Sequence, residues 1–105
     1  MSEEEIEFHK IGESIQEATR SQLFGKPCYK IDNKAFVCFY EDAMVFKLSL
    51  ATHAEALKLQ NSKLFDPSKK GRPMKEWVQV PYLHKKSWPQ FAKSAANYIS
   101  DLLKK

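Results

Sequence analysis

The segment that most constrains the fold is residues 34–40, KAFVCFY, which is apolar at nearly every position. A strand with one solvated face alternates apolar and polar side chains, so this run predicts a central strand, either buried on both faces or flanked on one face by a helix. Asp32 and Asn33 precede the run, and Glu41 and Asp42 follow it. Both pairs fit short hairpin turns, since Asn and Asp tolerate positive φ. The segment therefore predicts the middle of an antiparallel sheet.

Other short runs have the composition of strands. Residues 23–25, 28–31, 43–48, 63–66 and 74–80 are rich in aromatic, branched or alternating apolar residues and are bounded by turn residues. We expect three or four strands before a middle helix and two after it, in an antiparallel sheet of about five strands.

Three segments show helical periodicity or helix-capping signals. Phe8, Ile11 and Ile15 fall on one face of a helix within residues 3–20. Thr52 and Glu55 have the spacing of a capping box, which predicts a helix at residues 53–60. A last helix is predicted after Ser87, another capping residue, with an apolar stripe expected in the core: Trp88, Phe91, Ala95, Tyr98 and Leu102.

These elements predict the order αβββαββα and a single α+β domain over residues 1–105. A chain of 105 residues is too short to divide into two well-buried cores. We therefore expect helices packed against one face of the antiparallel sheet.

The charge is unevenly distributed along the chain. Residues 1–57 carry six Lys and Arg against ten acids, a net charge of −4, whereas residues 58–105 carry eleven against three, a net charge of +8. A basic half of this kind is a candidate surface for an anionic partner. The alternative is that its lysines only keep a small domain soluble.

The basic charge is densest around residues 67–73, a segment that we call the basic loop. Lysine and arginine there suit phosphate oxygens, and nearby Trp77 could stack on a base. The alternative for Trp77 is packing in the core or against Pro73 and Pro81, and the sequence leaves open whether this side chain is buried. The predicted nucleic-acid-binding residues in and around this loop are Lys63, Lys69, Lys70, Arg72 and Lys75.

Several site classes lack their sequence signatures. The three glycines are too far apart for a nucleotide-binding fingerprint, and no serine has the glycine flanks of a nucleophile elbow. His9, His53 and His84 fall on different predicted elements, without the spacing of metal ligands. We expect a protein that is not an enzyme and that has no cofactor and no metal.

Compartment and cysteine chemistry follow from composition. No apolar run approaches the length of a membrane span, and the acidic start MSEEEIEFHK does not resemble a secretory signal. We therefore expect a cytoplasmic protein with no membrane association.

Cys28 and Cys38 lie in apolar runs and are expected to act as small hydrophobes, although a disulfide is possible if their strands pair in register.

Five short motifs resemble a known family: GKPC at 25–28, KAF at 34–36, VFKL at 45–48, LFDP at 64–67 and GRPMKEWVQVP at 71–81. With Trp88 and Pro89 they resemble small bacterial proteins of the TfoX N-terminal-domain type, which are structurally similar to the MmcQ/YjbR proteins. The resemblance covers roughly residues 10–100.

The resemblance implies a compact α+β domain with a role in nucleic-acid binding through two wings. Carried onto this sequence, the second wing would be the basic loop, and the first would be the turn of Asp32, Asn33 and Lys34, which adds Lys34 to the predicted binding residues. The glutamate-rich first helix should lie away from phosphates. The chain lacks the second domain of the competence regulators in this group, so their regulatory role is not expected.

The leading hypothesis is a binding module that contacts nucleic acid weakly and without sequence preference through the basic loop. The alternative is a protein-interaction or adaptor domain, which could self-associate as a homodimer, with Tyr29, Phe39 or Trp77 exposed on the sheet. A small-molecule pocket between sheet and helices is a third hypothesis.

Overall fold

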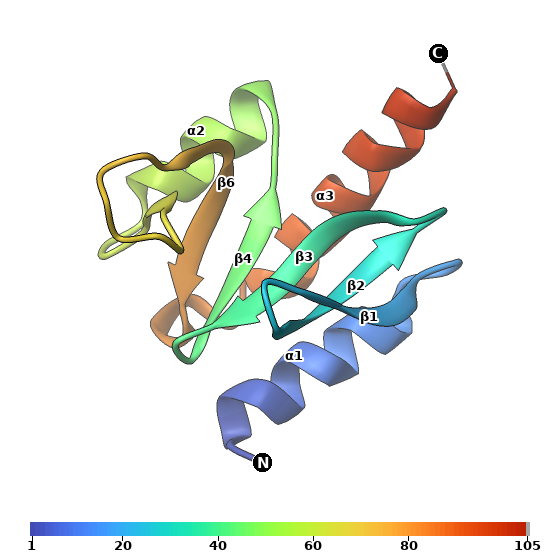
Figure 1. Cartoon of the computed structure of the whole chain (residues 1–105), viewed down its shortest axis with the longest axis horizontal. Coiled ribbons are helices and arrows are strands. Elements are labelled where there is room, and N and C mark those ends of the chain that lie inside the picture. The colour runs from blue at the N-terminus through green and yellow to red at the C-terminus, as the bar shows by residue number, and fades with distance from the viewer. Residues whose placement is uncertain (105) are drawn as a thin grey trace.

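A computed structural model of the protein describes residues 1–104, which form one α+β domain (Figure 1). The elements in chain order are α1 (Glu3–Ser14), β1 (Thr19–Leu23), β2 (Lys26–Ile31), β3 (Lys34–Tyr40), β4 (Ala43–Lys47), α2 (Leu50–Lys58), β5 (Lys63–Phe65), β6 (Met74–Pro81), the short 3-10 helix η1 (Tyr82–His84) and α3 (Trp88–Leu103). None of the helices in this part of the chain is long and apolar enough to cross a membrane.

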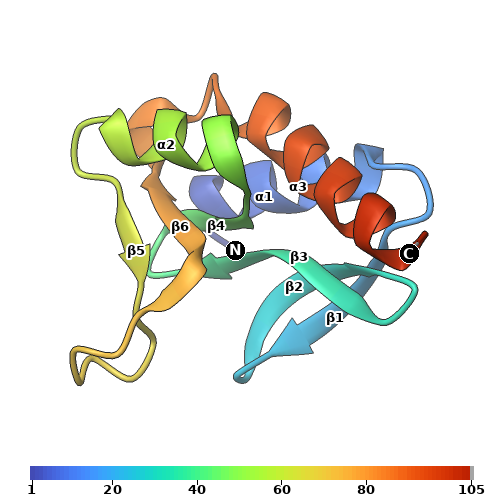
Figure 2. The ribbon, with the colours of Figure 1, turned by 90° about the horizontal axis from the view of Figure 1, so that it is seen from above.

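The strands form one antiparallel sheet in the order β1-β2-β3-β4-β6-β5. Figure 2 shows α1, α2 and α3 together on one side of this sheet, and we call the other side the helix-free face. The predicted α+β class and antiparallel sheet are therefore confirmed. Four strands precede α2, the upper number expected, so the sheet has six strands and the element order has one strand more than αβββαββα.

Three successive hairpins connect β1 to β4 through two-residue turns. Both turn residues have positive φ, the geometry of the type I′ turn, whose twist matches that of the flanking strands. The turns consist of Phe24 (φ 53°) and Gly25 (73°), Asp32 (48°) and Asn33 (69°), and Glu41 (48°) and Asp42 (61°). The second and third turns were predicted. The predicted strand at 23–25 was wrong beyond Leu23, because Phe24 and Gly25 reverse the chain.

The central strand β3 is buried on both faces, as its apolar run predicted. On the helix side it contributes to the main core. On the helix-free face a smaller apolar cluster forms, and its buried members are Cys28, Cys38, Val45, Phe65 and Trp77. The side chains on both faces of β3 are therefore buried, which explains why apolar and polar residues do not alternate along this strand.

The first two helices differ from their predicted bounds. Helix α1 ends at Ser14 instead of continuing to residue 20, because Thr19 already pairs with Lys30 in the sheet. Helix α2 begins at Leu50, three residues before the prediction, so Thr52 lies inside the helix and not at its cap. At α3, Ser87 is the N-cap, but its side chain donates or accepts no capping hydrogen bond.

The apolar stripe of α3 lies slightly off its predicted line. Trp88, Phe91 and Ala95 are buried as expected, but Ile99 takes the next core position, and Leu102 is 40% exposed. Tyr98 is only half-buried, and its hydroxyl donates to the carboxylate of Glu76. At 3.6 residues per turn, steps from 88 to 95 to 99 stay closer to one line than steps through 98 and 102.

The two cysteines are buried partners on neighbouring strands. Cys28 lies directly opposite Cys38 in the β2–β3 register, which meets the geometric condition for a disulfide, and both thiols are free in the structure. Burial raises the pKa of both thiols, that of Cys38 to about 12, so the reactive thiolate is disfavoured. They pack as small hydrophobes.

Candidate functional site

Two segments extend from the sheet on the helix-free face. Figure 2 shows the β1–β2 turn and the basic loop both projecting away from the three helices. Tyr40 connects them: the ammonium of Lys26 lies 5.9 Å from the centre of its ring, and the ring packs edge-on against Phe65 of β5 at 5.2 Å. The two projections therefore flank a surface that has Tyr40 in its middle.

Asp66 determines the shape of the basic loop. Its carboxylate accepts hydrogen bonds from the Ser68 hydroxyl at 2.8 Å and from the backbone N–H groups of Lys69 at 3.1 Å and Gly71 at 3.0 Å. Lys69 and Gly71 have φ of 59° and 76°, which turns the chain twice. The Asp66 charge thus holds the loop backbone, while the basic side chains at 69, 70 and 72 remain exposed.

These hydrogen bonds make the loop sensitive to acid. The Ser68 hydroxyl, followed by the backbone amides, holds the pKa of Asp66 below its ordinary value of 3.8. The ionised carboxylate stabilises the loop fully above about pH 4. This stabilisation is lost as the pH falls through the lowered pKa and the carboxylate becomes protonated. We expect the loop to keep its shape at neutral pH and to loosen only in acid.

Replacing Asp66 with alanine is expected to disorder the basic loop at neutral pH without unfolding the domain. The Gly71 amide loses its acceptor, so its protection against hydrogen exchange should fall to that of an open loop, whereas the Lys69 amide keeps the backbone carbonyl of Asp66 at 3.2 Å and should lose less. Amide exchange followed by NMR measures this directly. The control is Asp101→Ala on the exposed surface of α3. Unchanged protection in the Asp66 variant would show that the carboxylate does not organise the loop.

An ion pair joins the loop to the β3–β4 turn. The Lys69 ammonium lies 3.0 Å from the Glu41 carboxylate, and both side chains are more than half exposed. The hydrogen bond from Lys69 lowers the pKa of Glu41, and the same bond raises the pKa of Lys69. Because the pair is exposed, its contribution to stability is small. Lys69 is therefore available to a competing anion.

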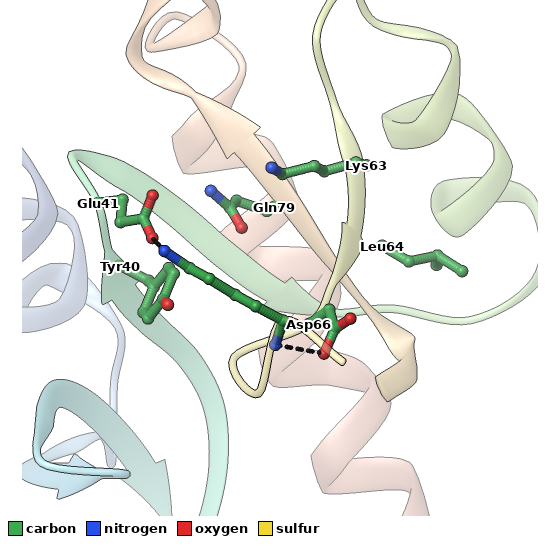
Figure 3. Close-up of a pocket in the computed structure, with 7 residues that line it drawn as sticks. Tyr40, Glu41, Lys63, Leu64, Asp66 and Gln79 are labelled. Atoms are coloured by element: carbon green, nitrogen blue, oxygen red, sulfur yellow. Dashed lines mark hydrogen bonds and ion pairs between the residues drawn. The ribbon is translucent and has the colours of Figure 1, made fainter. Parts of the chain in front are cut away.

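Beside this ion pair lies a polar cavity of about 370 Å³, which we call the Tyr40 pocket. Figure 3 shows the polar ends of Glu41, Lys63 and Gln79 directed toward the same space, whereas Leu64 points away. Lys63 and Gln79 are direct partners across β5 and β6, which places them on the same face. The residues that line the pocket are Tyr40, Glu41, Lys63, Leu64, Asp66, Lys69 and Gln79.

The structure brings most of the predicted binding residues together. Lys63 and Lys69 line the Tyr40 pocket, and Lys70 and Arg72 lie in the adjoining loop. Lys75 follows the loop at the start of β6. All five side chains are exposed. Of these five, Lys69 alone forms an ion pair with another residue in the described range 1–104.

Lys34 is not part of this group. It borders a separate cavity with Lys47 and the C-terminal end of α3, at the opposite end of β3 from Tyr40 and Glu41. Seven residues of strand span roughly 20 Å. The turn of Asp32, Asn33 and Lys34 therefore does not lie beside the basic loop, whereas the β1–β2 turn projects on the same side of the sheet as that loop.

The aromatic residues considered for exposed contacts are buried. Trp77 is 7% exposed and packs in the smaller cluster near Phe65, so the core interpretation of this side chain is correct. Tyr29 and Phe39 are 1% and 8% exposed and belong to the main core. The sheet therefore does not present the apolar surface that the protein-interaction hypothesis placed on these three residues.

The three histidines lie on separate elements. Two of them donate hydrogen bonds to backbone carbonyls, and the third is buried in the core. The Nε2 of His53 donates to the carbonyl of Lys75 at 2.7 Å, and that of His84 donates to the carbonyl of Gln60 at 2.8 Å. His9 is buried, with its Nδ1 2.9 Å from the Tyr29 hydroxyl. Within the described part of the chain, no three His, Cys, Asp or Glu side chains are placed to hold a metal ion.

Several residues of the site have almost no recognisable signal in the sequence, among them Phe24, Lys26, Tyr40 and Gln79. Phe24 lies in a turn where the sequence predicts a strand, Lys26 follows that turn, and the sequence predicts Tyr40 and Gln79 only as strand residues. Phe24 is 60% exposed, which is unusual for an aromatic residue. The one local signal was Phe-Gly between two short strands, a position where an exposed turn is expected.

No family model, curated protein or solved structure matches this chain. The resemblance to TfoX N-terminal domains therefore remains a prediction. The function has to be inferred from the geometry and charge of the site itself.

Proposed function

We propose that this protein is a small nucleic-acid-binding module that contacts the phosphate backbone without sequence preference through its helix-free face. The observation that carries the proposal is the convergence of exposed cations around the Tyr40 pocket. Lys63 and Lys69 line the pocket, and the Lys26 ammonium lies over the Tyr40 ring, while Lys70 and Arg72 belong to the adjoining basic loop and Lys75 to β6.

The acids of this surface do not cancel its charge. Asp66 directs its carboxylate to the loop backbone and the Ser68 hydroxyl. Glu41 engages one cation, Lys69, in an exposed pair that a phosphate oxygen can replace. Glu76 faces the Tyr98 hydroxyl. The remaining cations are free to neutralise phosphates, and each neutralised phosphate releases counterions.

The acidic helix lies elsewhere. Helix α1 begins with Glu3, Glu4 and Glu5 and belongs to the helix layer, on the opposite side of the sheet. A polyanion on the helix-free face therefore avoids the most acidic segment. The resemblance to TfoX N-terminal domains, which implies a winged nucleic-acid-binding role, supports the same proposal.

The test compares two variants with the same loss of charge. Lys69, Lys70 and Arg72 are changed together to alanine, and the control changes Lys85, Lys86 and Lys93, which are exposed beside or on α3. Fluorescence anisotropy with labelled duplex DNA at several salt concentrations measures affinity. If four phosphates are contacted, the slope of log affinity against log salt is roughly −3.6, and the loop variant should reduce it to about −0.9.

The control variant should keep a slope close to that of the unmodified protein. Equal loss of binding in both variants would show that net charge alone is responsible and would remove the assignment of the site. Absence of binding by the unmodified protein at low salt would refute the function. Protein interaction is not proposed as a second function, because Tyr29, Phe39 and Trp77 are buried.

A further inference from the structure

The β1–β2 turn carries a side chain that folding does not require. Phe24 is the first residue of a type I′ turn with φ of 53°, a position where Asn, Asp or Gly is strongly preferred. A bulky residue in the left-handed region is strained by about 1 kcal/mol or more. Its ring is also 60% exposed, so burial does not compensate for this strain.

The surroundings of Phe24 indicate what it could contact. The turn projects on the helix-free face, on the same side as the basic loop (Figure 2). Two residues after Phe24, Lys26 lies over the Tyr40 ring, which borders the pocket with Lys63 and Lys69. Aromatic rings and phosphate-binding cations therefore occur together along one path, from the turn through Tyr40 to the basic loop.

We propose that the ligand is single-stranded nucleic acid, with bases stacking on Phe24 and Tyr40 while phosphates contact Lys63, Lys69 and the basic loop; this rests on the proposed function. Stacking on exposed aromatic rings needs unpaired bases, whose faces are open in a single strand and covered in a duplex. The Tyr40 pocket, at about 370 Å³, falls within the size range of small-ligand sites and is far too small for a double helix.

The pocket chemistry fits a nucleotide unit. Tyr40 is half-buried and lines the pocket, and a base that stacks on its ring would take the place of the Lys26 ammonium, which lies 5.9 Å from the ring centre. Gln79 supplies both a donor and an acceptor for a base edge, and Lys63 supplies a cation on the same face. A phosphate entering beside Lys69 would take the place of the Glu41 carboxylate. Stacking is tolerant of sequence, which agrees with binding that has no sequence preference.

The decisive variant is Phe24→Asn, because its effects on folding and on binding are expected to be opposite. Asn is favoured at this turn position, so thermal stability should be equal or higher. Affinity for a labelled 15-nucleotide oligo-dT should fall about fivefold or more, since a stacking ring is lost. Affinity for a blunt 15-base-pair duplex should change by less than twofold. Anisotropy titrations at one low salt concentration give both values.

The matched control is Leu83→Asn, which removes an exposed apolar side chain, 66% accessible, from η1 outside the site. It should leave both affinities unchanged. Tyr40→Leu should also weaken oligo-dT binding about fivefold, while Tyr40→Phe should restore it.

Different results refute the two proposals separately. If the loop variant loses binding but Phe24→Asn and Tyr40→Leu bind oligo-dT normally, phosphate contact stands and stacking is wrong. If Phe24→Asn instead weakens duplex binding alone, the ring acts as a wedge between paired bases and the single-strand proposal is overturned. If the loop variant and the control triple bind equally, the proposed site falls and the stacking proposal falls with it.

Discussion

Replacing Trp88 with alanine is expected to lower the free energy of unfolding by about 4 kcal/mol, a large share of the stability of a domain of this size. Trp88 is 0% exposed, and its ring packs at 5.5 Å from that of Tyr82. Its indole N–H donates to the carbonyl of Val80 at 3.2 Å, which ties α3 to β6. Truncation therefore removes the apolar contacts and the hydrogen bond together and leaves a cavity between helix and sheet.

Urea unfolding followed by circular dichroism measures this effect, and Trp88→Phe provides the comparison. Phenylalanine keeps most of the buried ring area but cannot donate to Val80, so its cost should lie well below that of alanine. A cost under 1 kcal/mol for Trp88→Ala would contradict the packing described here, since a surface substitution has an effect of that size.

Gly12→Ala should be the second most damaging change, at about 3 kcal/mol, although alanine normally favours a helix over glycine. A Cβ at this position would lie 2.3 Å from Cε1 of the Tyr29 ring. Tyr29 is 1% exposed, and its hydroxyl is held by Nδ1 of His9 at 2.9 Å, so the ring cannot move aside easily. Helix α1 must therefore shift away from the sheet.

The control is Gly71→Ala in the basic loop, where a Cβ meets no atom within 4 Å but φ is +76°. Its cost should be about 1 kcal/mol, from backbone strain alone. A second check combines Gly12→Ala with Tyr29→Leu. If the clash is the cause, the double variant should be more stable than the sum of the single costs predicts. Simple additivity would rule out the steric explanation.

Much of the fold was readable from local patterns. The turns at Asp32–Asn33 and Glu41–Asp42 were predicted because Asn and Asp are compatible with positive φ, and this chemistry acts between adjacent residues. The double burial of β3 followed from its unbroken apolar run. The missing turn was at Phe24 and Gly25, where an aromatic residue stands in a conformation that local preferences oppose. A conflict of this kind is expected at functional sites.

The residues of the proposed site could be named only in part. The basic loop was recognisable from its charge, and two of the six predicted cations, Lys63 and Lys69, line the Tyr40 pocket. Lys34 lies apart from the others, because its turn is at the other end of β3. Glu41 was read only as a turn residue, since nothing in the sequence indicated that it would meet Lys69, 28 positions later.

Charge, turn chemistry and apolar periodicity were therefore sufficient to establish an antiparallel α+β domain with a basic second half, because each acts over a few neighbouring residues. The identity of the site required the three-dimensional arrangement. The sheet places β6 between β4 and β5, which brings the basic loop against the β3–β4 turn and opposite the β1–β2 turn. Such contacts join residues distant in the chain, and they depend on strand pairing and sheet curvature that no local pattern encodes.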